Sequence, residues 1–206
     1  MRDSAPTTAG AWRAADGTAV PFREATVAWA LAAHAELAET ATGYGYFVTV
    51  NELAERVQES SGVHTEAPTR TWMDAILRKV ARRCHSAGEP PLTALCVRQN
   101  HTIGDAYKYV LELAGLPIPD DLELHAAYAR WQCYQHYGAA VPADSGVPPL
   151  TPKVAAKRRV TLGTPAPEVK PEPARAPVCA DCFTQLPANG ICFTQLPANG
   201  ICFYCA

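Results

Sequence analysis

Apolar residues recur every three to four positions through most of the stretch between residues 21 and 140, and this spacing predicts amphipathic helices. The five expected helices cover residues 25–42, 50–60, 72–86, 105–114 and 121–137. In the third of these, one face is apolar from Trp72 to Cys84 and the opposite face is basic. That helix can therefore be anchored on a core while it presents cations to a partner.

Helix starts and ends carry their own signals. Three residue pairs have capping-box spacing: Thr49 with Glu52, Thr71 with Asp74, and Asp120 with Glu123. Gly88 and the prolines after it are placed to end the helix over 72–86. These signals fix the expected boundaries between the helices and the segments that join them.

Short segments of a different pattern separate the helices. Tyr46–Val48 is a β-prone run, and Leu92–Val97 is a nearly continuous apolar run that predicts a buried strand. Arg98–Gly104 is a polar turn, and residues 62–68 are expected to be a loop. The order of elements is that of a winged helix-turn-helix. The predicted fold is mainly α with a small β wing, winged helix-turn-helix-like, over residues 21–140.

The flanking regions differ in composition from this domain. Residues 1–20 are small and polar and are expected to be a flexible N-terminus. Residues 141–178 contain nine prolines and few large apolar side chains, which predicts a semi-extended Pro-rich linker. Residues 179–206 hold five of the eight cysteines and are expected to form a separate module.

The net charge of −2 excludes a uniformly basic protein but leaves room for a basic face. Residues 69–108 carry a net charge of +4 between two acidic segments. In a winged helix the third helix can enter the major groove while the wing touches the backbone. The residues expected to contact duplex DNA are Arg70, Arg78, Lys79, Arg82, Arg83, Arg98 and His101. The alternative is that these cations form an ordinary solvated helix face.

The run Ala87–Val97 followed by His101–Asp105 resembles a segment of uncharacterised winged-helix-like proteins of high-GC actinobacteria and their phages. It also resembles regulatory segments attached to some restriction-type nucleases. The resemblance covers residues 25–140 and implies a nucleic-acid-linked or mobile-element setting. It carries no catalytic residue, and the sequence lacks a His-Asn-His nuclease pattern.

Two C-x-x-C pairs lie near the end of the chain, Cys179 with Cys182 and Cys202 with Cys205. Four thiolates suit tetrahedral Zn²⁺, so the sequence predicts a structural zinc ribbon over residues 179–206. A redox pair is the weaker alternative. The ribbon is also a candidate surface for a protein partner.

A ten-residue segment of the ribbon is duplicated without change, at residues 182–191 and 192–201. Identity over ten residues indicates a recent duplication or a cloning scar and not a repeat fold. The second copy adds Cys192, so five cysteines compete for four ligand positions. Cys192 either loops out or substitutes for Cys182 or Cys202.

The other reactive residue types form no recognisable site in the sequence. Cys84, Cys96 and Cys133 lie in apolar contexts and are expected to be buried thiols, and the histidines have no metal-ligand spacing. No nucleophile–base pair or phosphate loop is visible, so no enzyme is expected. No apolar run approaches the ~20 residues of a membrane span, and the start lacks a secretory pattern. A cytoplasmic protein that binds no membrane is expected.

These observations favour a non-enzymatic, DNA-associated accessory or regulatory protein with a structural zinc ribbon. The alternative, from a different class, is a protein–protein interaction adaptor that makes no direct DNA contact.

We expect the ribbon to hold about one tightly bound zinc ion, because two C-x-x-C pairs supply four thiolates. Cys179→Ser or Cys205→Ser should lower the zinc content per chain by one, whereas Cys192→Ser should leave it unchanged. Metal analysis of freshly purified, reduced protein measures this. Absence of zinc from the unsubstituted protein would contradict the ribbon.

Overall fold

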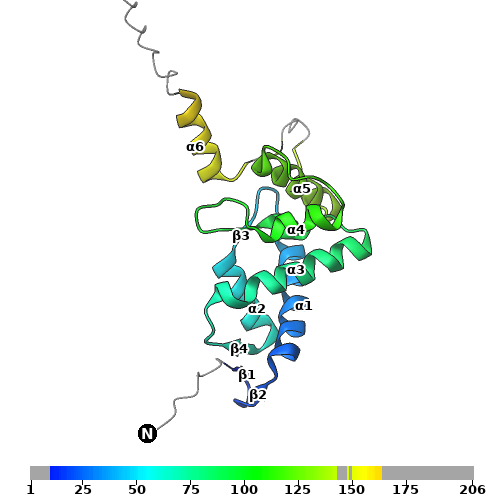
Figure 1. Cartoon of the computed structure of the whole chain (residues 1–206), viewed down its shortest axis with the longest axis vertical. Helices are drawn as coiled ribbons and strands as arrows, with labels where there is room; N and C mark the ends of the chain where they lie inside the picture. The colour runs from blue at the N-terminus through cyan, green and yellow to red at the C-terminus, as the bar shows by residue number, and fades with distance from the viewer. Residues whose placement is uncertain (1–9, 143–147, 149, 164–206) are drawn as a thin grey trace, which may run out of the picture. The chain divides into compact units, whose positions relative to one another are not determined.

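The computed structural model describes residues 10–142, 148 and 150–163, and this part of the chain is mainly helical (Figure 1). Its helices are α1 (Phe22–Ala41), α2 (Val50–Ser61), α3 (Thr69–Ala87), α4 (Ala106–Leu113), α5 (Leu122–His136) and α6 (Pro152–Gly163). Its short strands are β1 (Ala11–Arg13), β2 (Ala19–Val20), β3 (Val48–Thr49), β4 (Val63–Thr65) and β5 (Cys96–Val97). A 3₁₀ helix, η1 (Leu92–Leu95), precedes β5. The linker after residue 163 and the zinc ribbon lie outside the described residues.

The core forms where α1 packs against α3. Trp29 and Trp72 meet there with ring centroids 4.6 Å apart, and both side chains are buried. Trp29 Nε1 donates to the Val63 carbonyl at 2.7 Å, so its polar atom is satisfied inside the core. The predicted apolar row of α3 is confirmed, since Trp72, Ile76 and the residues beyond it to Cys84 on this face are buried.

The boundaries of α2 follow the sequence signals closely. Thr49 and Glu52 form the predicted capping box, in which the Thr49 N–H donates to Glu52 Oε2 at 2.8 Å. Gly62 ends the helix in the left-handed conformation, with φ of 65°. Local chemistry alone was sufficient to predict this element.

The start of α3 differs from the expectation. Thr71 and Asp74 do not form a capping box, because the helix begins earlier, at Thr69, after Pro68. Thr71 instead donates its hydroxyl to the Pro68 carbonyl at 2.6 Å. Pro68 fixes its own φ at −54°, and the helix begins directly after it, three residues before the predicted start.

Two small sheets lie at opposite ends of α1 (Figure 1). The first has the order β2-β1-β4 and is antiparallel, with Ala11 opposite Thr65. Residues 10–20 were expected to be flexible and residues 62–68 to be a loop, but both contribute strands to this sheet. β1 and β4 are about 50 residues apart in the sequence, so a local pattern could not show that they pair.

The second sheet pairs β3 with β5 in parallel, and an antiparallel bridge joins Val97 to Ile103. The run 92–97 is buried as predicted, but its first four residues form η1 instead of a strand. Arg130 donates to the Ala94 carbonyl at 3.2 Å, which satisfies a backbone acceptor that no strand neighbour reaches. The turn after β5 is closed by the single bridge between Val97 and Ile103.

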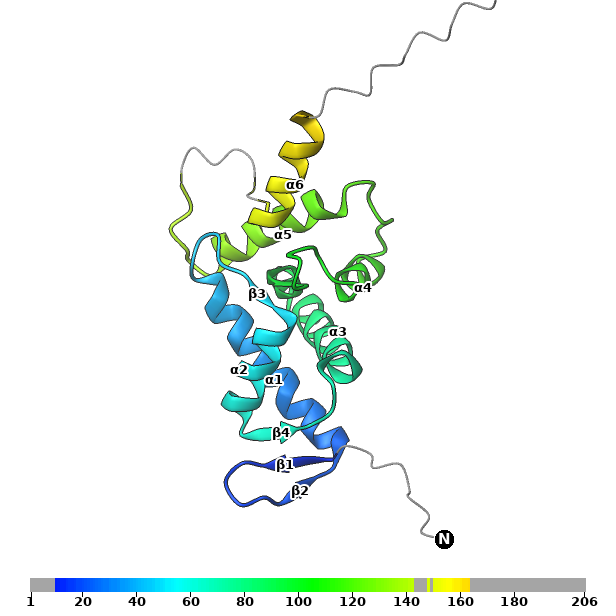
Figure 2. The same ribbon diagram turned by 90° about the vertical axis from the view of Figure 1, so that its left-hand side faces the viewer.

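The chain after α5 does not begin a linker at once. Pro152 starts α6, as proline often does at a first helical position, and the Ala- and Lys-containing run after it favours a helix. Thr151 donates to the His101 carbonyl at 2.8 Å, and Arg158 pairs with Asp121. Figure 2 shows α6 beside α5. The predicted Pro-rich linker over 141–178 thus contains a docked helix at 152–163.

The start of α5 is also shifted by one residue from the predicted pair. Asp121, and not Asp120, caps the helix by accepting from the Leu124 N–H at 3.0 Å. Glu123 accepts from the Ile103 N–H at 2.9 Å and so ties α5 to the turn after β5. The sequence pattern assigned Glu123 to a helix cap, but its side chain makes this tertiary contact instead.

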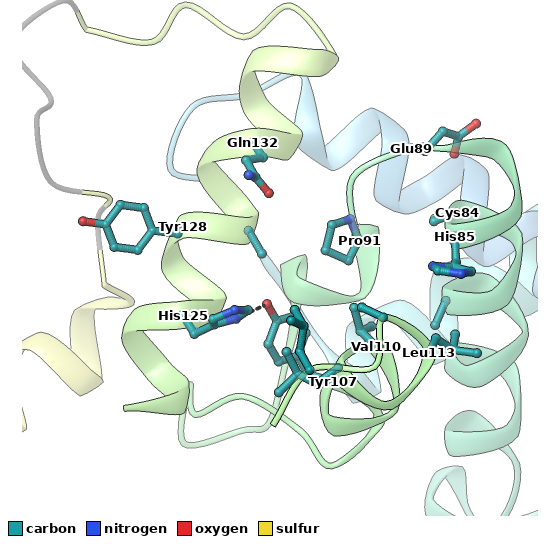
Figure 3. A pocket seen from close by; sticks show the side chains of 15 residues that line it. Cys84, His85, Glu89, Pro91, Tyr107, Val110, Leu113, His125, Tyr128 and Gln132 are labelled. Atoms are coloured by element: carbon teal, nitrogen blue, oxygen red, sulfur yellow. Dashed lines mark hydrogen bonds between the residues drawn. The ribbon is translucent and has the colours of Figure 1, made fainter. Parts of the chain in front are cut away.

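A pocket of about 340 Å³ opens between α3, α4 and α5 (Figure 3). Apolar side chains of α4 line one wall, and a hydrogen bond of 2.9 Å between Tyr107 and His125 crosses its floor.

Cys84, Cys96 and Cys133 are buried thiols, as predicted. Among the described helices, none combines the length and apolar character that a membrane span requires.

The Thr49 cap should contribute about 1 kcal/mol to the free energy of unfolding. Thr49→Ala is expected to lower that value by this amount in urea denaturation, because the Glu52 N–H loses its acceptor. Thr71→Ala is the matched control, since its hydroxyl lies inside α3 and caps no N–H. Equal losses of unfolding free energy in the two variants would show that the capping box does not supply this stability.

Candidate nucleic-acid interface

The exposed face of α3 carries the cations that the sequence singled out. Lys79, Arg82 and Arg83 lie at i, i+3 and i+4, so their side chains project side by side from one helix face. No carboxylate of the described residues lies within ion-pair distance of any of the three. This cationic face, defined by Lys79, Arg82 and Arg83, is therefore open to an anionic partner.

Arg70 and Arg78 are placed differently from these three. Arg70 is exposed in the first turn of α3, about 20 Å along the axis from Arg83 at 1.5 Å per residue. Arg78 Nε donates to Asp74 at 2.8 Å, and its guanidinium lies 4.9 Å from the centroid of the Tyr109 ring. The hydrogen bond to Asp74 raises the pKa of Arg78 above its usual value. Arg78 is thus held between α3 and α4.

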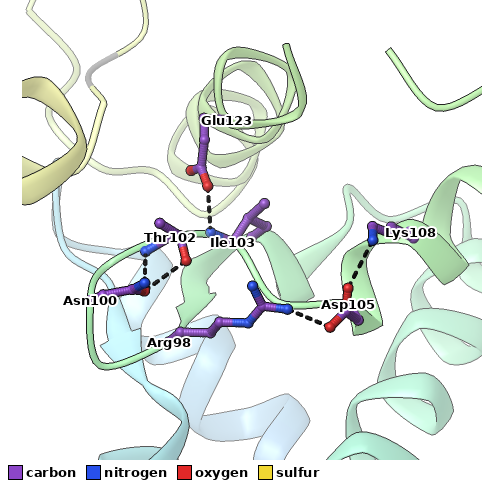
Figure 4. A network of polar contacts seen from close by, with 7 residues as sticks. All are labelled: Arg98, Asn100, Thr102, Ile103, Asp105, Lys108 and Glu123. Carbon is purple, nitrogen blue, oxygen red and sulfur yellow. Dashed lines mark hydrogen bonds and ion pairs between the residues drawn. The ribbon is translucent and has the colours of Figure 1, made fainter. Parts of the chain in front are cut away.

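The turn after β5 is a closed polar network (Figure 4). Arg98 pairs with Asp105, and Lys108 Nζ contacts the other oxygen of that carboxylate at 2.9 Å. The hydrogen bond from Lys108 and the charge of Arg98 lower the pKa of Asp105. Asn100 Oδ1 accepts from the N–H and hydroxyl of Thr102 at 3.1 and 2.7 Å. The charge of Arg98 is therefore balanced by the Asp105 carboxylate at the surface.

His101 at the tip of this turn is half-buried and not presented outward. Its backbone has φ of 64°, and its ring lies 5.0 Å from the Phe47 ring. The segment entering α6 covers it, with Thr151 bonded to its carbonyl and Lys153 Nζ donating to the Gln99 carbonyl at 2.9 Å. Lys153 is a cation that the sequence did not assign to the turn, because only the docking of α6 brings it there.

An open hollow of about 480 Å³ lies between Arg78 of α3 and the residues of α4. Arg78, Asp105, Lys108 and Tyr109 line it, so α4 lies between the edge of α3 and the turn. Lys79, Arg82 and Arg83 therefore share one face of α3, whereas Arg98 lies in the turn after β5 and pairs with Asp105 directly before α4. The predicted zinc ligands Cys179, Cys182, Cys192, Cys202 and Cys205 lie outside the described residues.

No protein-family model, no curated protein and no solved structure matches this chain.

Asp105 holds two cations of the turn in ion pairs, so its removal should expose them to phosphates. Asp105→Asn is expected to strengthen duplex binding and to steepen the plot of log K against log salt by up to about 0.9 for each cation released to a phosphate. Stability should change by less than ~1 kcal/mol, because exposed ion pairs contribute little.

Asp16→Asn is the matched control, since it removes the same charge from the distant β1–β2 turn. Equal gains in both variants would show that net charge, and not the turn, sets the affinity.

Proposed function

We propose that this protein is a non-enzymatic, DNA-associated accessory or regulatory protein. In this proposal, α1, α2, α3 and the turn after β5 act as a winged-helix-like unit, and α3 approaches the duplex. A structural zinc ribbon at residues 179–206 would engage a second site or a protein partner. The resemblance of residues 25–140 to winged-helix-like proteins of actinobacteria and their phages would imply the same setting.

The observation that supports this proposal best is the cationic face of α3. Its three cations are unpaired among the described residues, while Arg78 and Arg98 both have carboxylate partners. A helix anchored by seven buried side chains holds those cations on a fixed backbone. Phosphate contacts from such side chains position a protein on a duplex without reading sequence. The acidic segments on either side of 69–108 would restrict contact to this face.

The two other predicted contacts take secondary roles. Arg98 would reach phosphate only by exchanging its Asp105 partner, and His101 shapes the turn from a half-buried position. Base-edge contacts would therefore come from α3 more than from the turn.

The three buried cysteines agree with a cytoplasmic location. Each is a free thiol in the described region, and burial raises the pKa of Cys96 and of Cys133 to about 12. Thiols persist in the reducing cytoplasm.

One observation favours the alternative, a protein-interaction adaptor. Leu116 and Ile118 are 52% and 60% exposed on the loop between α4 and α5, and both line the open hollow of about 480 Å³. Exposed apolar side chains at a pocket rim are typical of protein-binding surfaces. This alternative predicts no salt-dependent binding to duplex DNA.

A salt series on the full-length protein distinguishes the two. Lys79→Ala/Arg82→Ala should flatten the slope of log K against log salt by nearly two, at about 0.9 per lost phosphate contact, for any duplex sequence. The melting temperature should change little, because Arg82 is exposed, Lys79 is only half-buried, and neither has a carboxylate partner among the described residues.

Arg13→Ala/Arg23→Ala removes the same charge from exposed positions in β1 and α1 and should leave the slope unchanged. Equal flattening by the two pairs would remove α3 from the interface. No binding by the unsubstituted protein at about 50 mM salt would leave the adaptor as the function.

A further inference from the structure

Three potential metal ligands that are far apart in the sequence meet at one end of α3. They are His34 of α1, Cys84 in the last turn of α3 and Glu89 just after that helix. One ligand atom from each lies within 4.8 Å of the other two. Cys84 is buried, and the other two are half-buried, so the cluster is not a chance gathering of surface side chains.

The end of α3 places two of these ligands beside each other. Gly88 adopts φ of 67°, and the Glu89 N–H turns back to donate to the Cys84 carbonyl at 2.9 Å. This is a Schellman motif, which reverses the chain over the last helical turn. As a result, the Glu89 side chain returns over the helix end that carries Cys84.

The third ligand comes from the packing of α1 on α3. His34 Nε2 donates to Glu89 Oε2 at 2.8 Å, since a carboxylate can only accept. The Tyr137 hydroxyl, just beyond α5, donates to the same oxygen at 3.4 Å. The hydrogen bond from His34 lowers the pKa of Glu89, so the carboxylate is ionised at neutral pH. The Glu89 carboxylate is therefore oriented by hydrogen bonds from His34 and Tyr137.

We propose that His34, Cys84 and Glu89 form a Zn²⁺ site in the helical domain, distinct from the predicted ribbon. Imidazole nitrogen, thiolate sulfur and carboxylate oxygen are the three ligand types that zinc accepts. With Zn–N near 2.0–2.1 Å and Zn–S near 2.3 Å, tetrahedral ligand atoms lie about 3.3–3.7 Å apart. The His34–Glu89 contact would open by roughly 0.5 Å. Binding would release the Cys84 thiol proton to solvent, and the His34 proton would move from Nε2 to Nδ1 so that Nε2 can ligate the metal.

Two of the three ligand residues border the pocket between α3, α4 and α5. Cys84 and Glu89 both line that pocket, as Figure 3 shows. Three protein ligands with one open position allow a metal to hold water or a small anionic ligand. The Tyr137 hydroxyl would remain as a hydrogen-bond partner of the ligating carboxylate, a contact that orients metal ligands in proteins.

The test uses full-length protein in which all five cysteines after residue 178 are replaced by Ser, so that the ribbon cannot bind metal. We expect it to retain about one zinc per chain. Adding His34→Gln should abolish that zinc. Adding His85→Gln should retain it, because His85 lines the same pocket but is not part of the cluster. Cobalt substitution should give a charge-transfer band of one thiolate, which Cys84→Ser removes.

Absence of metal from the five-Ser protein, with its helical content intact, would overturn the proposal and leave a simple His–Glu hydrogen bond. Equal zinc in the His34→Gln and His85→Gln variants would overturn it as well. Should the five-Ser protein fail to fold, the comparison moves to the unsubstituted background. There His34→Gln must lower the zinc content by one relative to His85→Gln, and no difference would reject the site.

Discussion

The contact between Trp29 and Trp72 is the constraint on which the other features depend. Both rings are buried, and each indole nitrogen donates to a backbone carbonyl, Trp29 to Val63 and Trp72 to Ala67. Aromatic pairs of this kind contribute large buried areas together with a preferred geometry. The pair fixes how α1 and α3 cross, and that crossing determines which face of α3 remains outside. It also brings the middle of α1 to the end of α3, where His34 meets Glu89.

Features that depend on neighbouring residues could be read from the sequence, and features that depend on distant ones could not. The Thr49–Glu52 cap, the apolar face of α3 and the left-handed end at Gly88 are all local and agree with prediction. The pairing of β1 with β4 and the docking of α6 depend on partners far along the chain, and the composition of these segments alone suggested flexibility. The His34–Cys84–Glu89 cluster has no sequence spacing at all, because a helix crossing creates it. The cationic face lies between these cases: periodicity placed its residues, but only the structure separated free cations from paired ones.

The basic residues divide into two groups with different physical roles. Arg78 pairs with Asp74 within α3 and lies over the Tyr109 ring of α4, while Arg98 and Lys108 share Asp105 at the start of α4. Exposed pairs of this kind add little stability, so their value lies in geometry. Lys79, Arg82 and Arg83 have no such partners in the described region and remain available. A near-neutral chain can in this way carry a local positive field without a high net charge.

The two short sheets bear on how fast the chain folds. β1 pairs with β4, and β3 pairs with β5, in both cases across about 50 residues of sequence. Folding rates fall as contacts become less local, because the loop entropy is lost before the contact forms. A helical chain with only neighbouring helix contacts would fold in microseconds to milliseconds. Strands of two or three residues therefore move this mainly helical domain toward the slower kinetics of mixed α/β proteins.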